Sequence, residues 1–453
     1  MYNVQCIHVP FLEVHGLVAR TRWPLAIAIL LLLAPLSIAP HSEADPRPRV
    51  RPGRVWVRLR DGGPPGLQQR ARSLPVGQLE ALVPQIHGAV LRVPPGQEIA
   101  AARRLAADPG VVYAVPIPPV HALDDPDDSG YASQWALPKI GAPSAWDVTT
   151  GSDQMVMAIV DSGIDLDHPD LESRLWTNPG EIPGNGEDDD GNGCQDDVHG
   201  CNFVPTPELP EGDPSDDYGH GTHVAGIAGA ATNNGVGTAG MSWAGSMMAV
   251  KVLDSSGSGY MDDVAQGIVY AVDNGARIVN LSLGGPSPFA PLQEALAYAR
   301  QGGALVVAAA GNHSAPGDPT HVFYPAAYPE AMAVAATDSL DRQASFSNHG
   351  PQISVAAPGV WVYSTCLGDN YCYMSGTSMA TPHVAGLAAL VWSRHPEYSP
   401  ALVQATIEMT AADVNASQYP GWDPYLGHGR IDAAAAVRLD LSSVYLPYVS
   451  KGP

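Results

Sequence analysis

The feature that most constrains the fold is a set of short apolar runs that alternate with helical segments rich in small residues. Each run is long enough for a strand and holds few polar residues, which is typical of strands buried on both faces. The strand candidates are 155–160, 247–253, 278–283, 304–309 and 331–335, and the intervening helix candidates are 220–231, 262–274 and 291–302. This alternation predicts a three-layer α/β fold with a mostly parallel central sheet. Such sheets carry their functional sites beyond the carboxyl ends of the strands.

Three polar residues stand where this architecture would place a site. Asp161 directly follows the first apolar run, and a charge at the end of a buried strand needs a partner. His220 lies between two glycines at the start of a small-residue helix, where backbones can approach closely. Ser378 precedes an apolar helix, and Pro382 is expected in the first turn of that helix. A serine before a helix is most often a cap, so Ser378 alone does not indicate a functional site. It does so only together with Asp161 and His220.

The segments around these three residues resemble the signatures of the subtilisin-type serine proteases (subtilases), in the same chain order of Asp, His and Ser. The three signatures are Met155–Ile164, Asp217–Gly226 and Ser375–His383. A fourth matching segment ends at Asn312, and the resemblance extends over about residues 134–437. It implies a subtilisin-like α/β fold preceded by a small α+β prodomain.

The resemblance also implies a serine endopeptidase that acts on proteins and peptides. Ser378 would attack the peptide carbonyl, His220 would be the general base and acid, and Asp161 would orient the imidazole. Asn312 would donate to the oxyanion. The substrate backbone would pair, as an added strand, with the family segment that here contains Ser282, Leu283 and Gly284.

Two alternatives to a broad endopeptidase remain open at this point. One is a catalytically silent subtilase fold that acts as a peptide-binding module, although every catalytic position holds the expected residue type. The other is a processing enzyme of narrow specificity. Phe323, just before Tyr324, is a candidate for a residue that lines the primary pocket and restricts it.

Calcium is the cofactor that the sequence favours. One acidic loop places oxygen ligands at alternating positions before a glycine, as in the first half of an EF-hand loop, and the candidate ligands are Asp188, Asp190, Asn192 and Asp197. A solvated acidic loop without a cation is the alternative. Family resemblance suggests a second calcium site at Asp170 and Asn234. His223, three residues after His220, could in principle bind a metal but is expected to be a structural hydrogen-bonding residue.

The cysteines predict two local disulfides. Cys194 lies close to Cys201 in the chain, and Cys366 lies close to Cys372, so each pair could close a small loop in an oxidising compartment. Free thiols are the alternative, and zinc is disfavoured because the chain has no CxxC or compact Cys/His spacing.

Residues 1–44 have the layout of a secretory signal, because arginines precede the apolar run 25–34. A membrane anchor is the alternative, but the run is short and Pro35 interrupts it. We therefore expect a secreted protein with no stable membrane anchor after signal cleavage.

Residues 45–121 resemble the inhibitory propeptide of subtilases, which acts on its own catalytic domain. Strands are expected at 54–60, 89–93 and 111–115, and helices at 79–86 and 97–107. An unrelated small domain is the alternative. The catalytic domain would then span 122–440, and the tail 441–453 is given no role.

Charge is distributed unevenly along the chain, whose formal net charge is −23. Residues 1–120 hold 13 Arg and 7 acidic residues, whereas the remainder holds 7 Arg, 3 Lys and 39 acidic residues. An acidic body argues against a nucleic-acid partner. It also allows the basic leader to dock electrostatically on the body. A monomer is the default expectation.

Overall fold

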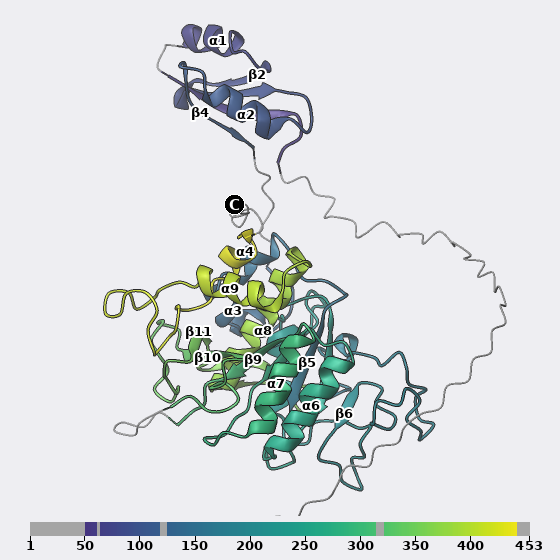
Figure 1. The fold of residues 1–453 in the computed structure, drawn as a ribbon. Coiled ribbons are helices and arrows are strands. Elements are labelled where there is room, and N and C mark those ends of the chain that lie inside the picture. The colour runs from purple at the N-terminus through teal and green to yellow at the C-terminus, as the bar shows by residue number, and fades with distance from the viewer. Residues whose placement is uncertain (1–49, 61–63, 118–124, 314–320, 442–453) are drawn as a thin grey trace, which may run out of the picture. The chain divides into compact units, whose positions relative to one another are not determined.

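The computed structural model describes residues 50–60, 64–117, 125–313 and 321–441 (Figure 1). Contacts divide the chain into two compact units, with the boundary between Val120 and His121. The predicted signal segment lies outside the described residues, as do residues 442–453 of the predicted tail. Each unit has its own buried hydrophobic residues.

In its described residues, the N-terminal unit combines two helices with an antiparallel four-stranded sheet of order β2-β3-β1-β4. Its elements are β1 (Arg54–Leu59), α1 (Pro64–Arg72), β2 (Gln78–Val83), a 3₁₀ turn (Pro84–Ile86), β3 (Gly88–Arg92), α2 (Glu98–Ala106) and β4 (Val111–Pro116). Val55, Val57 and Leu59 alternate with more exposed residues along β1, so one face of this strand enters the core. The unit is a small α+β domain, and its role as a propeptide stays a prediction.

The helix expected at 79–86 is wrong. Residues 78–83 form the edge strand β2, which pairs with β3. A short apolar run cannot be assigned to helix or strand from periodicity alone, and pairing with a neighbouring strand decided the outcome here. The first helix in the described part of the unit lies earlier, at Pro64–Arg72.

The larger unit is built on a seven-stranded sheet in which every pairing is parallel. The strand order is β11-β10-β9-β8-β5-β7-β6. The strands are β5 (Val156–Asp161), β6 (Gly200–Asn202), β7 (Ser246–Lys251), β8 (Ile278–Leu281), β9 (Leu305–Ala309), β10 (Ala331–Thr337) and β11 (Ile353–Pro358). The five predicted strands are all present. The two strands that were not predicted, β6 and β11, lie at the edges.

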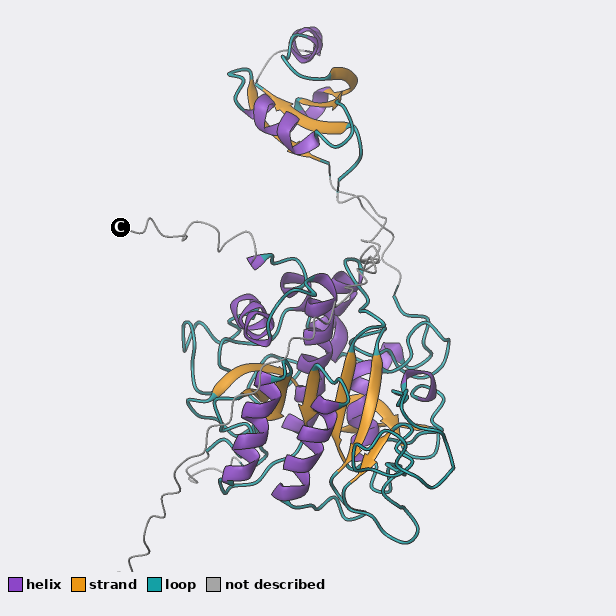
Figure 2. Ribbon diagram, turned by 45° about the vertical axis from the view of Figure 1, so that its right-hand side comes forward, coloured by secondary structure: helices purple, strands orange, loops and turns teal. Residues whose placement is uncertain are grey.

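Helices cover both faces of this sheet (Figure 2). They are α3 (Ala136–Lys139), α4 (Ala142–Trp146), α5 (His220–Gly229), α6 (Met261–Asp273), α7 (Ala290–Gln301), α8 (Thr377–Arg394), α9 (Pro400–Thr410) and α10 (Ala433–Ala436), with 3₁₀ turns at Tyr131–Ser133 and Glu172–Arg174. The buried residues of α5 and α8 belong to one hydrophobic core, and those of α6 and α7 belong to a second. The predicted three-layer α/β fold is therefore confirmed.

Alternation along the strands separates the two cores. In β5, Met157 and Ile159 enter the core beneath α5 and α8, whereas Ala158 and Val160 enter the core beneath α6 and α7. Because both faces are covered, every residue of β5 after Val156 is buried. This explains why the strand reads as a continuous apolar run that stops at Asp161.

The helix that carries Ser378 begins earlier than the apolar run suggested. Since α8 starts at Thr377, Pro382 lies inside the helix, and its expected place in the first turn is wrong. A proline there has no N–H to donate to the carbonyl four residues earlier, which belongs to Ser378. The Ser282 hydroxyl donates to that carbonyl instead, at 2.9 Å. This replacement bond makes the interior proline tolerable.

Both predicted disulfides are present. The Cys194–Cys201 bridge joins a loop to β6. The Cys366–Cys372 bridge ties together an antiparallel hairpin, β12 (Val362–Cys366) and β13 (Asn370–Met374), that immediately precedes α8.

Candidate active site

Asp161 is the last residue of the central strand β5 and is fully buried. Its Oδ1 accepts a hydrogen bond from the Ser162 backbone N–H at 2.7 Å. The same Oδ1 lies 2.7 Å from Nδ1 of His220. The imidazole is thus the partner that the buried strand-end carboxylate requires.

His220 is the first residue of α5. A side chain in place of the next residue, Gly221, would clash with the carbonyl of Gly163, so this glycine permits the helix to approach the end of β5. Burial disfavours the imidazolium, but the Asp161 carboxylate, with a smaller contribution from Asp216, outweighs that effect and raises the pKa of His220. The charged form of the ring is therefore stabilised where it lies.

Asp216 holds the start of α5 in place, and the sequence analysis did not single it out. Its Oδ1 accepts from the Ser162 hydroxyl at 2.8 Å and from the Gly219 N–H at 2.8 Å. Its Oδ2 accepts from the N–H and the hydroxyl of Thr222 at 2.9 and 2.6 Å. A carboxylate that accepts from N–H groups at a helix start is favourable. One side chain thereby fixes the loop after β5 relative to α5.

Lys251 is a second residue that the sequence analysis missed. It ends β7 and is 1% exposed. Its Nζ donates to the carbonyls of Ser162 and Leu253 at 2.8 and 3.0 Å and to Asp217 Oδ1 at 2.5 Å. The buried ammonium is fully partnered, as such a group must be. It joins the ends of β5 and β7 to the loop that leads into α5.

Ser378 is the second residue of α8, and its hydroxyl donates to the Ser282 carbonyl at 2.9 Å. The Ser282 hydroxyl donates in the opposite direction, to the Ser378 carbonyl. Ser282 comes directly after β8, so this reciprocal pair fixes the start of α8 on the end of the sheet.

Asn312 follows β9 and faces the start of α8. Its Oδ1 accepts from the N–H and the hydroxyl of Thr377 at 2.8 and 2.9 Å. Because the oxygen is engaged, the Nδ2 donors are turned toward Gly376. An atom placed as a Cβ on Gly376 would lie 3.2 Å from Asn312 Nδ2 and 3.5 Å from the Ser378 nitrogen. Two nitrogen atoms that carry N–H donors therefore lie within 3.5 Å of one point beside Ser378.

A cleft of about 400 Å³ contains most of the predicted site. The predicted residues that line it are His220, Ser282, Leu283, Gly284, Asn312, Phe323 and Ser378. Asp161 lies behind the imidazole, with no exposed surface. Five segments are thus brought together at the carboxyl ends of the strands: the end of β5, the residues after β8 and β9, and the starts of α5 and α8.

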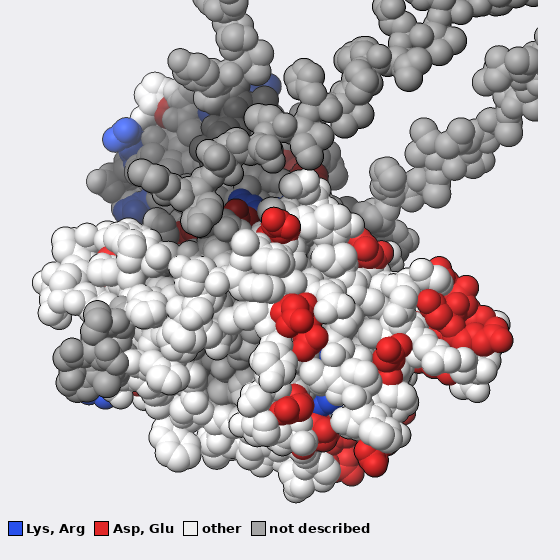
Figure 3. All heavy atoms as spheres, turned by 60° about the horizontal axis from the view of Figure 1, so that its bottom comes forward, with Lys and Arg blue, Asp and Glu red and all other residues white. Residues whose placement is uncertain are grey.

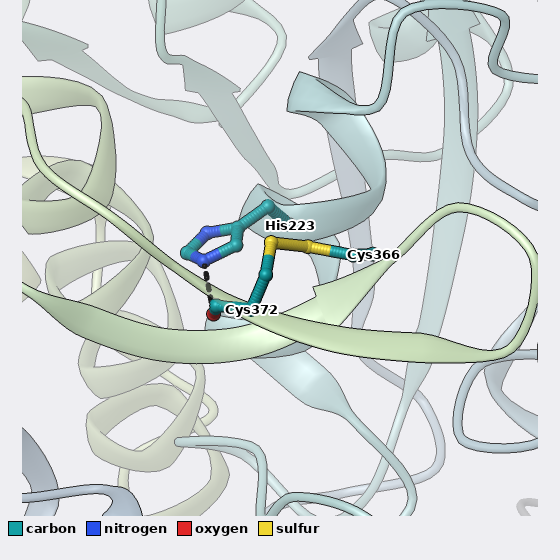
Figure 4. Close-up of side chains that lie close together, drawn as sticks. All are labelled: His223, Cys366 and Cys372. Atoms are coloured by element: carbon teal, nitrogen blue, oxygen red, sulfur yellow. Dashed lines mark hydrogen bonds between the residues drawn. A yellow bond between two sulfur atoms is a disulfide. The ribbon is translucent and has the colours of Figure 1, made fainter.

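His223 lies one turn beyond His220 and contacts the disulfide of the β12–β13 hairpin (Figure 4). Its Nε2 lies 3.2 Å from the Cys372 carbonyl, and burial lowers its pKa to about 4. His223, Cys366 and Cys372 lie close enough to share a metal ion, but both sulfurs are joined to each other. The expected structural role of His223 fits this neutral, buried ring.

The acidic loop brings together carboxylates that a cation would stabilise. Oxygens of Glu181, Asp188 and Asp190 lie within 4.8 Å of one another. Glu181 was not predicted, because nothing in its local sequence distinguishes it. One of its oxygens, Oε2, is buried without a hydrogen-bond partner, and burial raises its pKa. An orphaned carboxylate oxygen beside two further carboxylates is a donor set that suits Ca²⁺.

The other two predicted ligands of this loop are engaged with neighbouring side chains. Asp197 is fully buried and accepts from the amides of Asn178 and Asn192, each at 2.9 Å, and from the Tyr270 hydroxyl. Burial raises the pKa of Asp197, and repulsion from Asp190 adds to the shift. Both residues therefore support the loop from its inner side.

The residues of the second predicted calcium site also lie together. Asp170 is fully buried, and its carboxylate accepts from the Asn234 amide at 2.9 Å and from the Thr238 N–H at 2.7 Å. A second buried carboxylate, Asp128, has its pKa raised by burial and, to a smaller extent, by the charge of Asp170. Two buried acids that repel each other fit a cation site.

A buried carboxylate, an imidazole and a serine hydroxyl at the edge of one cleft, with two N–H donors lying beside them, are the groups that acyl transfer requires. On a three-layer α/β sheet, in the chain order Asp, His and Ser, they define a class of serine endopeptidases. A family model described as the subtilase family matches residues 152–429. The chain belongs to the subtilase family.

Curated relatives agree with this assignment. A thermophilic serine proteinase from Bacillus sp. (strain AK1) is 40% identical over 349 residues, which cover 77% of each chain. Thermitase from Thermoactinomyces vulgaris is 43% identical over 316 residues, which cover 69% of this chain and 99% of thermitase. Among solved structures, a protease from Pseudoalteromonas arctica PAMC 21717 matches with a TM-score of 0.57 and 30% identity, over 69% of this chain and 99% of that one. The protein is accordingly a serine endopeptidase with protein substrates.

Proposed function

We propose that this endopeptidase works through an Asp161–His220–Ser378 triad. Ser378 Oγ attacks the scissile carbonyl, and His220 takes the hydroxyl proton and later gives it to the leaving amine. Asp161 fixes the imidazole tautomer through the 2.7 Å contact with Nδ1 and stabilises the imidazolium. Asn312 Nδ2 and the Ser378 N–H donate to the oxyanion.

The single observation that carries this proposal is the common cleft. It is lined by His220, Asn312 and Ser378, and the carboxylate behind His220 raises the pKa of the ring. Residues 282–284 form another wall of the same cleft, which supports their proposed pairing with an extended substrate backbone.

We further propose that the protein is secreted as a precursor whose residues 45–121 act as a propeptide. The compact N-terminal unit supports this, because it has a core of its own and is separated from the larger unit at Val120. Charge supports it as well. Residues 1–120 are basic, whereas acidic side chains gather in several groups on the face of the larger unit in Figure 3. In the described part of the chain, no helix is both long and apolar enough to cross a membrane.

Calcium is the proposed structural cofactor. The acidic loop would hold it through Glu181, Asp188 and Asp190, with Asp197 and Asn192 bracing the loop. Asp170, with Asn234 and Asp128 beside it, is the second proposed site. At both places the ion would offset repulsion between carboxylates, and no step of the reaction passes through it.

The test is to express the full precursor as wild type and as Ser378→Ala, with Ser375→Ala as the matched control three residues away. Mass spectrometry follows the loss of the N-terminal segment, and casein hydrolysis is measured in parallel. Wild type and the control should trim themselves and digest casein, whereas Ser378→Ala should lose about 10⁶-fold in kcat and stay intact.

The competing function is a catalytically silent peptide-binding module. A wild-type precursor that stays intact and inert in the presence of calcium would favour that module and overturn the proposed triad. Trimming of Ser378→Ala at the wild-type rate would overturn self-processing alone.

A further inference from the structure

The cleft beside Ser378 has an aromatic residue at the point where a substrate side chain must enter. Leu283, Gly284, Ala309 and Gly311 line this cleft together with Asn312 and Ser378. Phe323 lines the same cleft. The established activity does not explain why a large apolar ring stands at this place.

Backbone hydrogen bonds hold Phe323 in position. Its own N–H donates to the Ala310 carbonyl at 2.9 Å. The next residue, Tyr324, exchanges two backbone hydrogen bonds with Gly285, each 2.9 Å long. The segment is thus fixed between the chain that leaves β8 and the chain that leaves β9.

The ring itself is packed on several sides. A Cβ added to Gly311 would lie only 2.9 Å from Cγ of Phe323, so the ring lies directly against the Gly311 backbone. On the other wall, a Cβ on Gly284 would lie 3.4 Å from Cβ of Phe323. The rings of His313 and His321 flank the phenyl ring, with centroids 5.1 and 6.2 Å away. Since these neighbours restrict rotation, the ring is a fixed part of the cleft.

The position of the substrate follows from the groups already described. The scissile carbonyl carbon must approach Ser378 Oγ, with its oxygen between Asn312 Nδ2 and the Ser378 N–H. With the backbone laid along residues 282–284, the side chain of the residue that supplies this carbonyl points between the Gly284 and Gly311 walls. Phe323 lies against both of these glycines and therefore takes up part of that space.

We propose that Phe323 forms the floor of the primary specificity pocket and restricts the residue on the amino side of the scissile bond to small side chains, such as alanine or serine. This inference rests on the proposed triad. A pocket whose depth is filled rejects longer side chains by steric exclusion, and each excess methylene group typically costs about 10- to 200-fold in kcat/KM.

The experiment uses mature enzyme and four-residue p-nitroanilide peptides that differ only in having Ala, Leu or Phe before the scissile bond. Wild type should cleave the Ala peptide at least about tenfold more efficiently than the Phe peptide. Phe323→Gly should raise the Phe-to-Ala ratio of kcat/KM by about 10- to 100-fold. Phe323→Ala should change the ratio in the same direction, and it replaces the glycine variant in the test if that variant folds poorly.

Phe289→Ala is the matched control, because it removes an aromatic ring that packs on a core and does not line the cleft. Its ratio should equal that of wild type. Two results would overturn the inference, provided that the Ala peptide is still cleaved. One is a wild-type preference for the Phe or Leu peptide, and the other is a Phe-to-Ala ratio of kcat/KM that is unchanged in both Phe323 variants. If wild type cleaves none of the peptides and no casein, the proposed function fails with it.

Discussion

Gly376 occupies a position where any side chain would enter the proposed oxyanion site. A methyl group on this residue would lie 3.2 Å from Asn312 Nδ2 and 3.5 Å from the Ser378 nitrogen, close to where the oxyanion would sit. Gly376→Ala should therefore lower kcat by about 10²- to 10³-fold, as the loss of one oxyanion donor does, with little change in KM.

The measurement is steady-state kinetics on a peptide substrate, together with a thermal melt to verify folding. Asn312→Ala provides the comparison. If the two residues act on the same oxyanion, the double variant should lose much less activity than the product of the two single effects. Losses that multiply would contradict the shared site.

In the proposed mechanism, Asp216 acts on the reaction through His220, so its removal should appear in the pH profile. The proposed base works only when the imidazole is neutral, and burial, which lowers the pKa of His220, is outweighed by the Asp161 and Asp216 carboxylates, which raise it. In Asp216→Asn the pKa should fall, and the acid limb of the kcat/KM profile should move to lower pH.

Asp165→Asn is the control for the pH profile, because this nearby carboxylate accepts from the Gly368 N–H rather than from the start of α5. Its acid limb should coincide with that of wild type. An acid limb that stays fixed in Asp216→Asn, or moves to higher pH, would refute the electrostatic role of Asp216.

At the scale of elements, the contact between α8 and the end of β8 depends on a side-chain hydroxyl that replaces a missing backbone N–H donor. Pro382 leaves the Ser378 carbonyl without a helical partner, and the Ser282 hydroxyl supplies one. Ser282→Ala should therefore reduce the free energy of unfolding by about 1 kcal/mol or more. Adding Pro382→Ala restores an N–H inside the helix and should recover part of that loss.

A double-mutant cycle in chemical denaturation, made in the Ser378→Ala background to prevent autolysis, measures this coupling. Thr406→Ala is a suitable control, because its hydroxyl donates to a carbonyl inside α9, away from the Ser282–Ser378 contact. Strictly additive effects of Ser282→Ala and Pro382→Ala would mean that the hydroxyl does not replace the missing N–H.

Residues that end buried strands could be predicted from the sequence. Because helices cover both faces of the sheet, a strand such as β5 is apolar throughout, and the first polar residue marks its end. Asp161 was found in this way, whereas the segment that contains Ser282 was identified from its resemblance to the family segment. Asp216 and Lys251 were missed, because their roles arise from hydrogen bonds to segments distant in sequence. Residues 79–86 were assigned to a helix because a short apolar edge strand has no distinctive period.

For the whole molecule, we expect the buried acids to make stability depend on pH and, through the two proposed sites, on calcium. Burial raises the pKa of Asp128 and Asp197 above the ordinary value of 3.8. The native state then binds more protons than the unfolded chain, so the free energy of unfolding falls as pH rises from the ordinary value through the raised one. In EDTA, the Tm of Ser378→Ala should fall over this range, and Ca²⁺ should reduce the fall.

Two variants compare how a buried and an exposed carboxylate contribute to the pH dependence of the Tm. Asp197→Asn should flatten the pH dependence in EDTA, whereas Asp167→Asn, at an exposed position, should leave it unchanged. Differential scanning fluorimetry across the pH range gives both curves. A Tm that does not respond to Ca²⁺ at any pH would contradict both proposed calcium sites.

Because lysine is scarce in this protein, acylation of its buried lysine can report when the interior opens. The part of the chain that the structure describes holds two lysines, and the Lys139 ammonium lies 2.8 Å from Asp341 Oδ2. The Lys251 amine is almost completely shielded, at the junction between the ends of β5 and β7 and the loop before α5. An amine-acylating reagent should therefore modify Lys251 only when that junction opens. The mass gained by one peptide thus reports how often the protein exposes its interior, in the absence of any substrate.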